Sequence, residues 1–224
     1  MLAALPEHEY EHLENHLYDV RMTLGRVVQQ AHHPIRKLVF PVDCVISLLY
    51  LSTEGDATEV AVVGREGVVG VAGFLGGISS PTHAVVQTSG HAYVLDTGIA
   101  SAEFNAVSAF RARLLLFTQA LMTQIAQTAA CNRHHSIEQQ LCRRLLLTCD
   151  RVDSNTLYMT HELIASMLGV RRVGISEAAA KLQNKGFIRC QRGQITLVDR
   201  AGLESTACEC YGVIASEYRK LLSE

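Results

Sequence analysis

The sequence predicts an α+β protein built from three successive parts, and three observations lead to this prediction. Residues 22–98 contain short runs of β-branched and aromatic residues that are separated by turn signals. Residues 102–149 contain neither proline nor glycine and carry apolar residues at helical spacing. Residues 160–198 contain two short amphipathic segments around a glycine, followed by a hairpin pattern. We therefore expect a β domain over 1–101, a long helix with a connecting helix over 102–149, and a small helical domain over 150–224.

The composition is that of a globular chain with unevenly distributed charge. Hydrophobic residues make up 48% of the 224 positions and charged residues 19%, which is enough apolar material for buried cores. The first hundred residues hold 5 basic and 11 acidic side chains, whereas residues 160–200 hold 7 basic and 3 acidic side chains. The second region could present a basic face to a phosphate backbone, although the whole chain has a net charge of −2.

Neither a membrane span nor a secretion signal is expected. The sequence has no run of eighteen apolar residues, and its first residues lack the basic and apolar regions of a signal peptide. We therefore expect a cytoplasmic protein without a membrane partner. The seven cysteines are scattered and include no Cys-x-x-Cys pair, so we expect reduced thiols and no zinc or iron–sulfur centre.

The first domain is expected to begin with a helix over 7–19, because Leu13, Leu17 and Val20 recur at helical spacing. Five strands are expected to follow, over Lys37–Phe40, Val45–Leu51, Glu59–Val63, Ala84–Thr88 and Ala92–Leu95. Short strands with regular turns between them are typical of antiparallel barrels and of double-stranded β-helix (jelly-roll) folds. The sequence therefore predicts a barrel of this kind.

The long helix carries an apolar stripe that repeats every three or four residues. A long, largely uncharged helix needs a partner, which is either the β domain or the same helix of a second subunit. The residues that we assign to a homodimer interface are Leu114, Phe117, Leu121, Ile125 and Thr128. A second helix is expected after Ser136, which is a suitable N-cap, and a final helix over Arg200–Leu222.

Residues 160–184 show the spacing of a helix-turn-helix. Ala165 is small where a second helix must cross closely, and Gly169 allows the left-handed turn that joins two helices. The second helix then starts with Arg171 and Arg172. In this motif the beginning of the second helix enters the major groove of DNA, where arginine can bind guanine bidentately or pair with phosphate.

Two short strands around Arg192–Gly193 would form a wing next to this motif. Basic residues on a wing are typical phosphate contacts, which position a protein on DNA without reading its sequence. The sequence therefore predicts binding of double-stranded DNA. The residues assigned to this interface are Thr160, His161, Arg171, Arg172, Gly174, Ser176, Glu177, Lys181, Arg189 and Arg192.

The sequence resembles the Crp/Fnr family of bacterial transcription regulators, most strongly over residues 136–199 and more weakly over 36–135. The stronger part includes Ser-Ile-Glu-Gln-Gln-Leu-Cys-Arg-Arg-Leu-Leu-Leu, the helix-turn-helix pattern and Gly-Phe-Ile before the hairpin. The resemblance implies a cyclic-nucleotide-binding-like barrel, a dimerisation helix and a winged helix-turn-helix domain. It also implies a regulator that binds a pseudo-palindromic operator as a homodimer, with RNA polymerase as a further candidate partner.

The sequence departs from the family pattern at two places. The best-known members carry a Glu and an Arg on the recognition helix where this sequence has Val173 and Glu177, whereas Arg172 matches a further contacting arginine of the family. We therefore expect a different operator sequence. Members that bind cyclic nucleotides hold the phosphate with an arginine, but no Arg or Lys occurs between Arg65 and Arg111. We predict no cofactor and do not expect cyclic AMP to bind at the usual site.

Three further observations concern metal binding, disulfides and catalysis. His8, His12 and His16 share one face of the expected first helix and could hold a transition metal, although a solvated face is the simpler interpretation. Cys208 and Cys210 would diverge on a helix, so no disulfide between them is expected. No nucleophile elbow or metal-hydrolase pattern occurs, so we expect no enzyme. A metal-, haem- or redox-responsive regulator and a constitutive DNA-binding protein are the alternatives, and the effector is not predicted.

Overall fold

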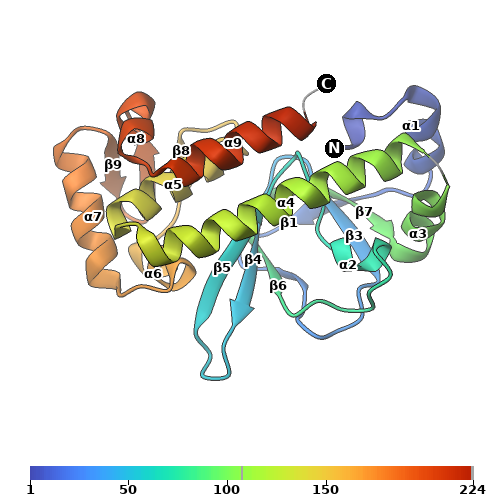
Figure 1. Ribbon diagram of the computed structural model, residues 1–224, viewed down its shortest axis with the longest axis horizontal. Coiled ribbons are helices and arrows are strands. Elements are labelled where there is room, and N and C mark those ends of the chain that lie inside the picture. The colour runs from blue at the N-terminus through green and yellow to red at the C-terminus, as the bar shows by residue number, and fades with distance from the viewer. Residues whose placement is uncertain (107, 223–224) are drawn as a thin grey trace.

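The first part of the chain folds into two antiparallel sheets around a common apolar core. The computed structural model describes residues 1–106 and 108–222 (Figure 1). One sheet has the strand order β1-β7-β3 and the other β2-β6-β4-β5. The strands are β1 Tyr18–Met22, β2 Val27–Gln29, β3 Lys37–Pro41, β4 Val45–Leu51, β5 Ala57–Val63, β6 His83–Thr88 and β7 Gly90–Asp96. This jelly-roll-like arrangement and the helical remainder confirm the predicted α+β class.

Apolar residues that pair across neighbouring strands explain the register of both sheets. Val39 of β3 lies opposite Val94 of β7, and Ile46 of β4 lies opposite Val63 of β5. All four side chains are buried, so a shift of one residue would expose them. The helices of this part are the 3-10 helix η1 Leu2–Ala4, α1 Glu7–Glu14, α2 Val71–Phe74 and α3 Thr97–Asn105.

Two helices, α4 (Ala109–His134) and α9 (Glu209–Leu222), lie side by side across the molecule (Figure 1). Ser108 caps α4, because its Oγ accepts a hydrogen bond from the backbone N of Arg111 at 3.2 Å. The ring of Tyr218 in α9 packs edge-on against Phe117 of α4, with centroids 6.4 Å apart. Ile214 and Tyr218 share one apolar core with the strands, so α9 completes the core of the β domain.

The remaining elements form a small domain with a second apolar core. They are α5 Ile137–Cys149, β8 Thr156–Tyr158, α6 His161–Leu168, α7 Arg172–Asn184, β9 Ile188–Gln191, β10 Gln194–Leu197 and α8 Arg200–Thr206. The strands form a sheet with the order β8-β10-β9. Ser136 and Gln139 form a capping box at the start of α5, which confirms the predicted start of this helix.

Three predicted helix limits are wrong. The first helix ends at Glu14, and Tyr18–Met22 forms β1 because these residues pair with β7. The long helix starts at Ala109, since α3 precedes it and residue 106 has an extended backbone. The expected helix Arg200–Leu222 is divided into α8 and α9, because Ala207 is extended (φ −63°, ψ 155°). Helical spacing alone did not reveal these interruptions.

Most of the apolar stripe assigned to the homodimer is covered by other elements of this chain. Leu114, Phe117, Leu121 and Thr128 are buried within this chain, where α4 packs on α9 and β5. Of the five assigned residues only Ile125 is exposed, at 39%. The sequence shows that α4 is apolar on more than one side, but it does not show which side the rest of the chain covers. No helix among the described residues is both long and apolar enough to cross a membrane.

Candidate nucleic-acid interface

The helix-turn-helix is built by local contacts at the turn between α6 and α7. Thr160 caps α6, since its Oγ1 accepts a hydrogen bond from the backbone N of Leu163 at 3.1 Å. Gly169 ends α6 with a left-handed backbone (φ 65°), a conformation that glycine adopts without strain. Val170 N then donates to Ala165 O at 3.0 Å, and Arg171 is the residue before the first turn of α7. These positions confirm the predicted helix-turn-helix.

Three of the residues assigned to DNA contact, Gly174, Ser176 and His161, are only partly exposed and make contacts within the domain. A Cβ atom added to Gly174 would lie 2.7 Å from Cδ1 of Ile137, so glycine allows α7 to approach α5 closely. Ser176 Oγ lies 3.1 Å from Nδ1 of His161, and this hydrogen bond joins the start of α6 to α7. The positions of Gly174, Ser176 and His161 indicate that these residues orient the recognition helix.

The outer face of α7 carries exposed side chains at its first turn and along one stripe. Arg171 and Arg172 are exposed at the beginning of the helix. Val173, Glu177 and Lys181 are also exposed, and their spacing of four residues places them on one face. Val173 is 59% exposed, so the stripe also presents an apolar side chain. The stripe is therefore accessible to a binding partner.

The wing adds two basic residues beside this face. Arg192 (φ 47°) and Gly193 (φ 77°) both have positive φ angles, as a two-residue hairpin turn between β9 and β10 requires. Arg189 of β9 and Arg192 at the turn are exposed. A groove between the wing and the start of α6 is lined by Thr160, Arg172 and Arg192. The wing and α7 thus present basic side chains around one concave surface.

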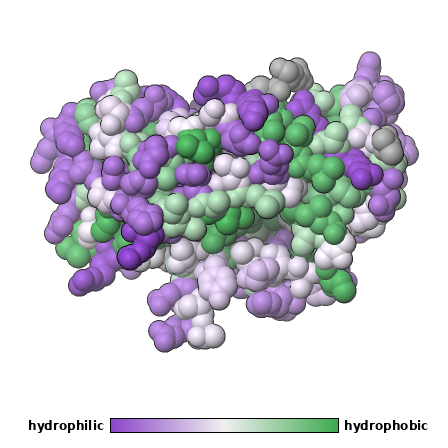
Figure 2. Space-filling view, viewed as in Figure 1, coloured by the Kyte–Doolittle hydropathy of each residue, from purple (hydrophilic) through white to green (hydrophobic). Residues whose placement is uncertain are grey.

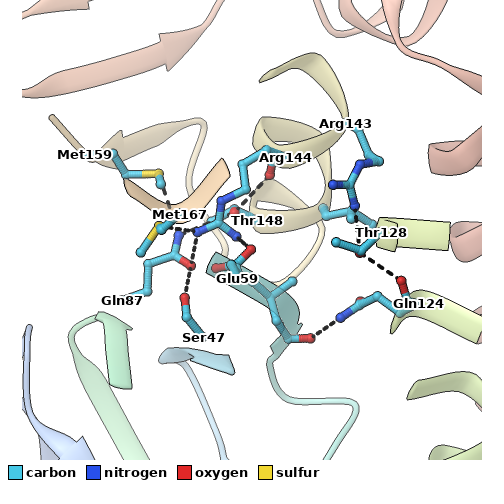
Figure 3. Close-up of polar contacts among 12 residues, drawn as sticks. Ser47, Glu59, Gln87, Gln124, Thr128, Arg143, Arg144, Thr148, Met159 and Met167 are labelled. Atoms are coloured by element: carbon cyan, nitrogen blue, oxygen red, sulfur yellow. Dashed lines mark hydrogen bonds and ion pairs between the residues drawn. The ribbon is translucent and has the colours of Figure 1, made fainter. Parts of the chain in front are cut away.

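A buried polar cluster connects the β domain to the helix-turn-helix (Figure 3). Arg144 of α5 forms an ion pair with Glu59 of β5, and their side chains are only 2% and 8% exposed. Arg144 Nη2 also donates to Oε1 of Gln87 at 2.7 Å and lies 2.9 Å from Sδ of Met167 in α6. Ser47 Oγ donates to the same Gln87 oxygen at 3.0 Å. One guanidinium therefore contacts both sheet and recognition domain.

Burial decides the protonation behaviour of this ion pair. Desolvation raises the pKa of the Glu59 carboxyl, and the positive charge of Arg144 opposes that rise. Desolvation lowers the pKa of Arg144, and Glu59 opposes that decrease. Because both groups are buried, each charge depends on the other for electrostatic compensation. Removal of either partner should therefore lower the stability of the fold strongly.

Two further connections reach the first domain. Arg143 Nη1 donates to Oγ1 of Thr128 in α4 at 3.1 Å, so α5 is also bound to the long helix (Figure 3). The hairpin between β4 and β5 touches the helix-turn-helix itself, since a Cβ atom added to Gly169 would lie 3.3 Å from Thr58 Oγ1. The turn before the recognition helix is thus in direct contact with the β domain.

These connections were not predicted from the sequence. Glu59 and Arg144 are 85 positions apart, and no local pattern relates them. A signal was present in Arg143 and Arg144, which occupy a helix of otherwise apolar residues, Leu141–Leu147. Two adjacent arginines in such a helix indicate buried partners, because an unpaired buried charge is costly. The three histidines weighed as metal ligands do not share a helix, since α1 ends before His16.

Comparisons with known proteins agree with this geometry. Residues 139–206 match the family model of the Crp-like helix-turn-helix domain. A Crp-family transcriptional regulator from Thermus thermophilus superposes with a TM-score of 0.70 at 19% identity, covering 84% of this chain and 96% of the other. FixK2 from Bradyrhizobium japonicum gives a TM-score of 0.71 at 15% identity, covering 86% and 98%.

A third similar structure is that of a ligand-responsive regulator. The c-di-GMP responsive global regulator CLP from Xanthomonas campestris superposes with a TM-score of 0.67 at 12% identity, covering 86% of this chain and 99% of the other. Identities this low establish the common fold only. A comparison with curated protein sequences finds no match.

Proposed function

Because the chain carries a Crp-like helix-turn-helix domain and resembles Crp/Fnr-family transcription regulators over its whole fold, we propose that it binds a pseudo-palindromic operator as a homodimer. The observation that carries this proposal is the exposed face of α7 with Arg171 and Arg172 at its first turn. In a helix-turn-helix this end of the second helix enters the major groove. We propose no enzymatic activity, a cytoplasmic location, and RNA polymerase as a further partner.

The recognition helix offers three kinds of contact to DNA. Arg171 and Arg172 can bind guanine O6 and N7 or a phosphate, and Glu177 can accept a hydrogen bond from cytosine N4. The exposed Val173 fits the methyl group of thymine, which is the apolar feature of the major groove. Arg189 and Arg192 on the wing are placed to contact phosphates. Thr160 and Lys181 complete the proposed surface.

A second apolar stripe on α4 supports the homodimer. Leu115, Met122 and Ile125 are exposed at 42%, 66% and 39%, and Ala129 continues the stripe at the coiled-coil spacing. Figure 2 shows a pale to green band across the middle of this face, where Figure 1 places α4. Pairing of this stripe with its copy would bury these side chains. We therefore propose Leu115, Met122, Ile125 and Ala129 as the dimer interface.

The β domain has no cationic side chain where family members bind a cyclic phosphate. Residues 66–110 contain no Arg or Lys, and Gly70 at the start of α2 packs against Leu38. Without a cation, burial of a phosphate would lack compensation. We propose that cyclic AMP is not the effector.

We also propose that the chain is divided into three parts, residues 1–101, 102–149 and 150–224. The last helix of the third part, α9, packs on the first part.

Selection from a random duplex library tests the proposed DNA binding. Wild-type protein should enrich a pseudo-palindromic sequence, and binding to that duplex should weaken steeply with salt. The double variant R171A/R172A should lose protection of the selected site in footprinting while its circular dichroism and oligomeric state are unchanged. The matched control is R21A, which removes an exposed arginine from β1 in the other domain. Unchanged footprints for R171A/R172A would contradict the assigned role.

A further inference from the structure

Three cysteines and one histidine meet where the long helix ends. Cys131 and His135 lie one helical turn apart at the end of α4, and Cys208 and Cys210 lie at the start of α9. The four ligand atoms of these residues are all within 4.8 Å of one another. The three cysteines form a separate small core and are exposed by only 0%, 4% and 2%. Such a convergence of thiols and an imidazole is the ligand type of a tetrahedral zinc centre.

The distances within this cluster match the edges of a metal-centred tetrahedron. Zinc–sulfur bonds of about 2.3 Å place two sulfur atoms about 3.8 Å apart, and a sulfur and a nitrogen about 3.6 Å apart. In the structure Cys131 Sγ lies 3.4 Å from Cys208 Sγ, and Cys210 Sγ lies 3.6 Å from His135 Nδ1. Small movements of buried side chains would therefore complete the coordination. All seven cysteines of the chain are free thiols in the structure.

The surroundings of His135 suit a metal ligand. His135 Nε2 lies 3.2 Å from the Glu209 carboxylate, so Nδ1 is left for a metal while Nε2 is oriented by an acid. The His135 side chain is 15% exposed, which gives an ion a route to the otherwise buried thiols.

We propose that Cys131, His135, Cys208 and Cys210 bind one Zn²⁺ ion per chain. The ligands occupy two junctions, since His135 lies between α4 and α5 and Cys208 lies between α8 and α9. A bound ion would join these junctions and fix α5 against α9. Because α5 carries Arg144 and packs on α7, the ion would also fix the helix-turn-helix relative to the β domain. Zinc binding itself does not depend on the DNA binding proposed above.

Cobalt substitution tests this site without reference to DNA. Untagged protein is reduced, freed of metal with a chelator, and titrated anaerobically with Co²⁺. We expect thiolate-to-cobalt charge-transfer bands and intense tetrahedral d–d bands that saturate at one equivalent and disappear on addition of Zn²⁺. Elemental analysis of the protein purified without chelator should give one zinc per chain.

Variants assign the ligands. C208S and H135Q should abolish the tetrahedral spectrum, whereas C190S, which changes a half-buried thiol on the wing, should leave it unchanged. E209Q should retain the spectrum and lower metal affinity about 10–100-fold, because its carboxylate only orients His135. This residue is exposed, so the variant is expected to fold.

Three results would overturn the proposal. One is the absence of a tetrahedral cobalt spectrum at stoichiometric metal in reduced wild-type protein. Another is a spectrum that C208S and H135Q both retain. The third is a Cys131–Cys208 disulfide in zinc-free purified protein that, after reduction, still takes up no cobalt. That last result would assign the pair to thiol redox chemistry instead.

Discussion

The ion pair between Glu59 and Arg144 allows the connection between the two domains to be tested by one substitution. E59Q keeps the shape of the side chain and one hydrogen-bond acceptor, but it removes the negative charge. Arg144 would then remain as a buried cation, since its side chain is 2% exposed. Its other partners, Gln87 and Met167, carry no charge. The substitution should therefore destabilise the fold far more than a surface change would.

The expected loss of stability in E59Q follows from the burial of both groups. Removing one partner of a buried ion pair costs about 3–5 kcal/mol, because the remaining charge is desolvated without compensation. For a chain of this length a loss of about 4 kcal/mol corresponds to a decrease of about 8–16 °C in Tm. The exposed pair Arg65–Asp153, with side chains 48% and 80% exposed, provides the comparison. Its variant R65Q should change stability by less than about 1 kcal/mol.

Urea unfolding followed by circular dichroism measures both variants at one fixed protein concentration. A third variant, E59L/R144M, replaces the pair with apolar residues and should be close to wild type in stability, as replaced buried ion pairs often are. The reasoning would be refuted if E59Q and R65Q lost similar amounts of stability. It would also be refuted if E59L/R144M were as unstable as E59Q, since packing and not charge would then explain the loss.

Three other predictions concern the dimer, the recognition helix and the metal. M122E should convert the dimer to a monomer in analytical ultracentrifugation, whereas L24E, at a similarly exposed apolar residue of the β domain, should remain dimeric; a dimeric M122E would exclude the proposed α4 stripe. G174L should push α7 away from Ile137 and lower both Tm and DNA affinity, and an unchanged Tm would show that the close approach is not required. Removal of zinc should weaken binding to the selected duplex and increase hydrogen exchange in α5 of the free protein. If exchange in α5 increased while DNA affinity stayed the same, the metal site would not contribute to the proposed DNA binding.

The parts of the molecule that depend on local spacing could be predicted from the sequence. Gly169 is required by a left-handed turn, and the flanking apolar residues recur at the positions that bury both helices of the motif. The wing could be predicted because Arg192-Gly193 separates two short strand patterns, and the turn found there has positive φ angles at both residues. Each of these features is determined within about 30 residues of chain.

The features that depend on distant residues could not be predicted. The face of α4 was misassigned because Leu114 and Phe117 are covered by α9, about a hundred positions later. The thiol cluster was not predicted because Cys131 and Cys208 are 77 positions apart, and His135 and Cys210 are 75 positions apart. Cys208 and Cys210 were placed inside a continuous helix, whereas the interruption before α9 turns both toward Cys131 and His135.

The packing of α9 on the β domain has a consequence for biosynthesis. Strands β1 to β7 leave the ribosome well before α9, yet Ile214 and Tyr218 of α9 belong to the core of those strands. Until α9 has been translated, the nascent chain therefore lacks the helix that packs on Phe117 of α4 and its apolar neighbours. Domains usually fold one after another during synthesis, but here the domain made first is completed by the helix made last. A product truncated before α9 would keep that surface uncovered and would be a substrate for chaperones and proteases.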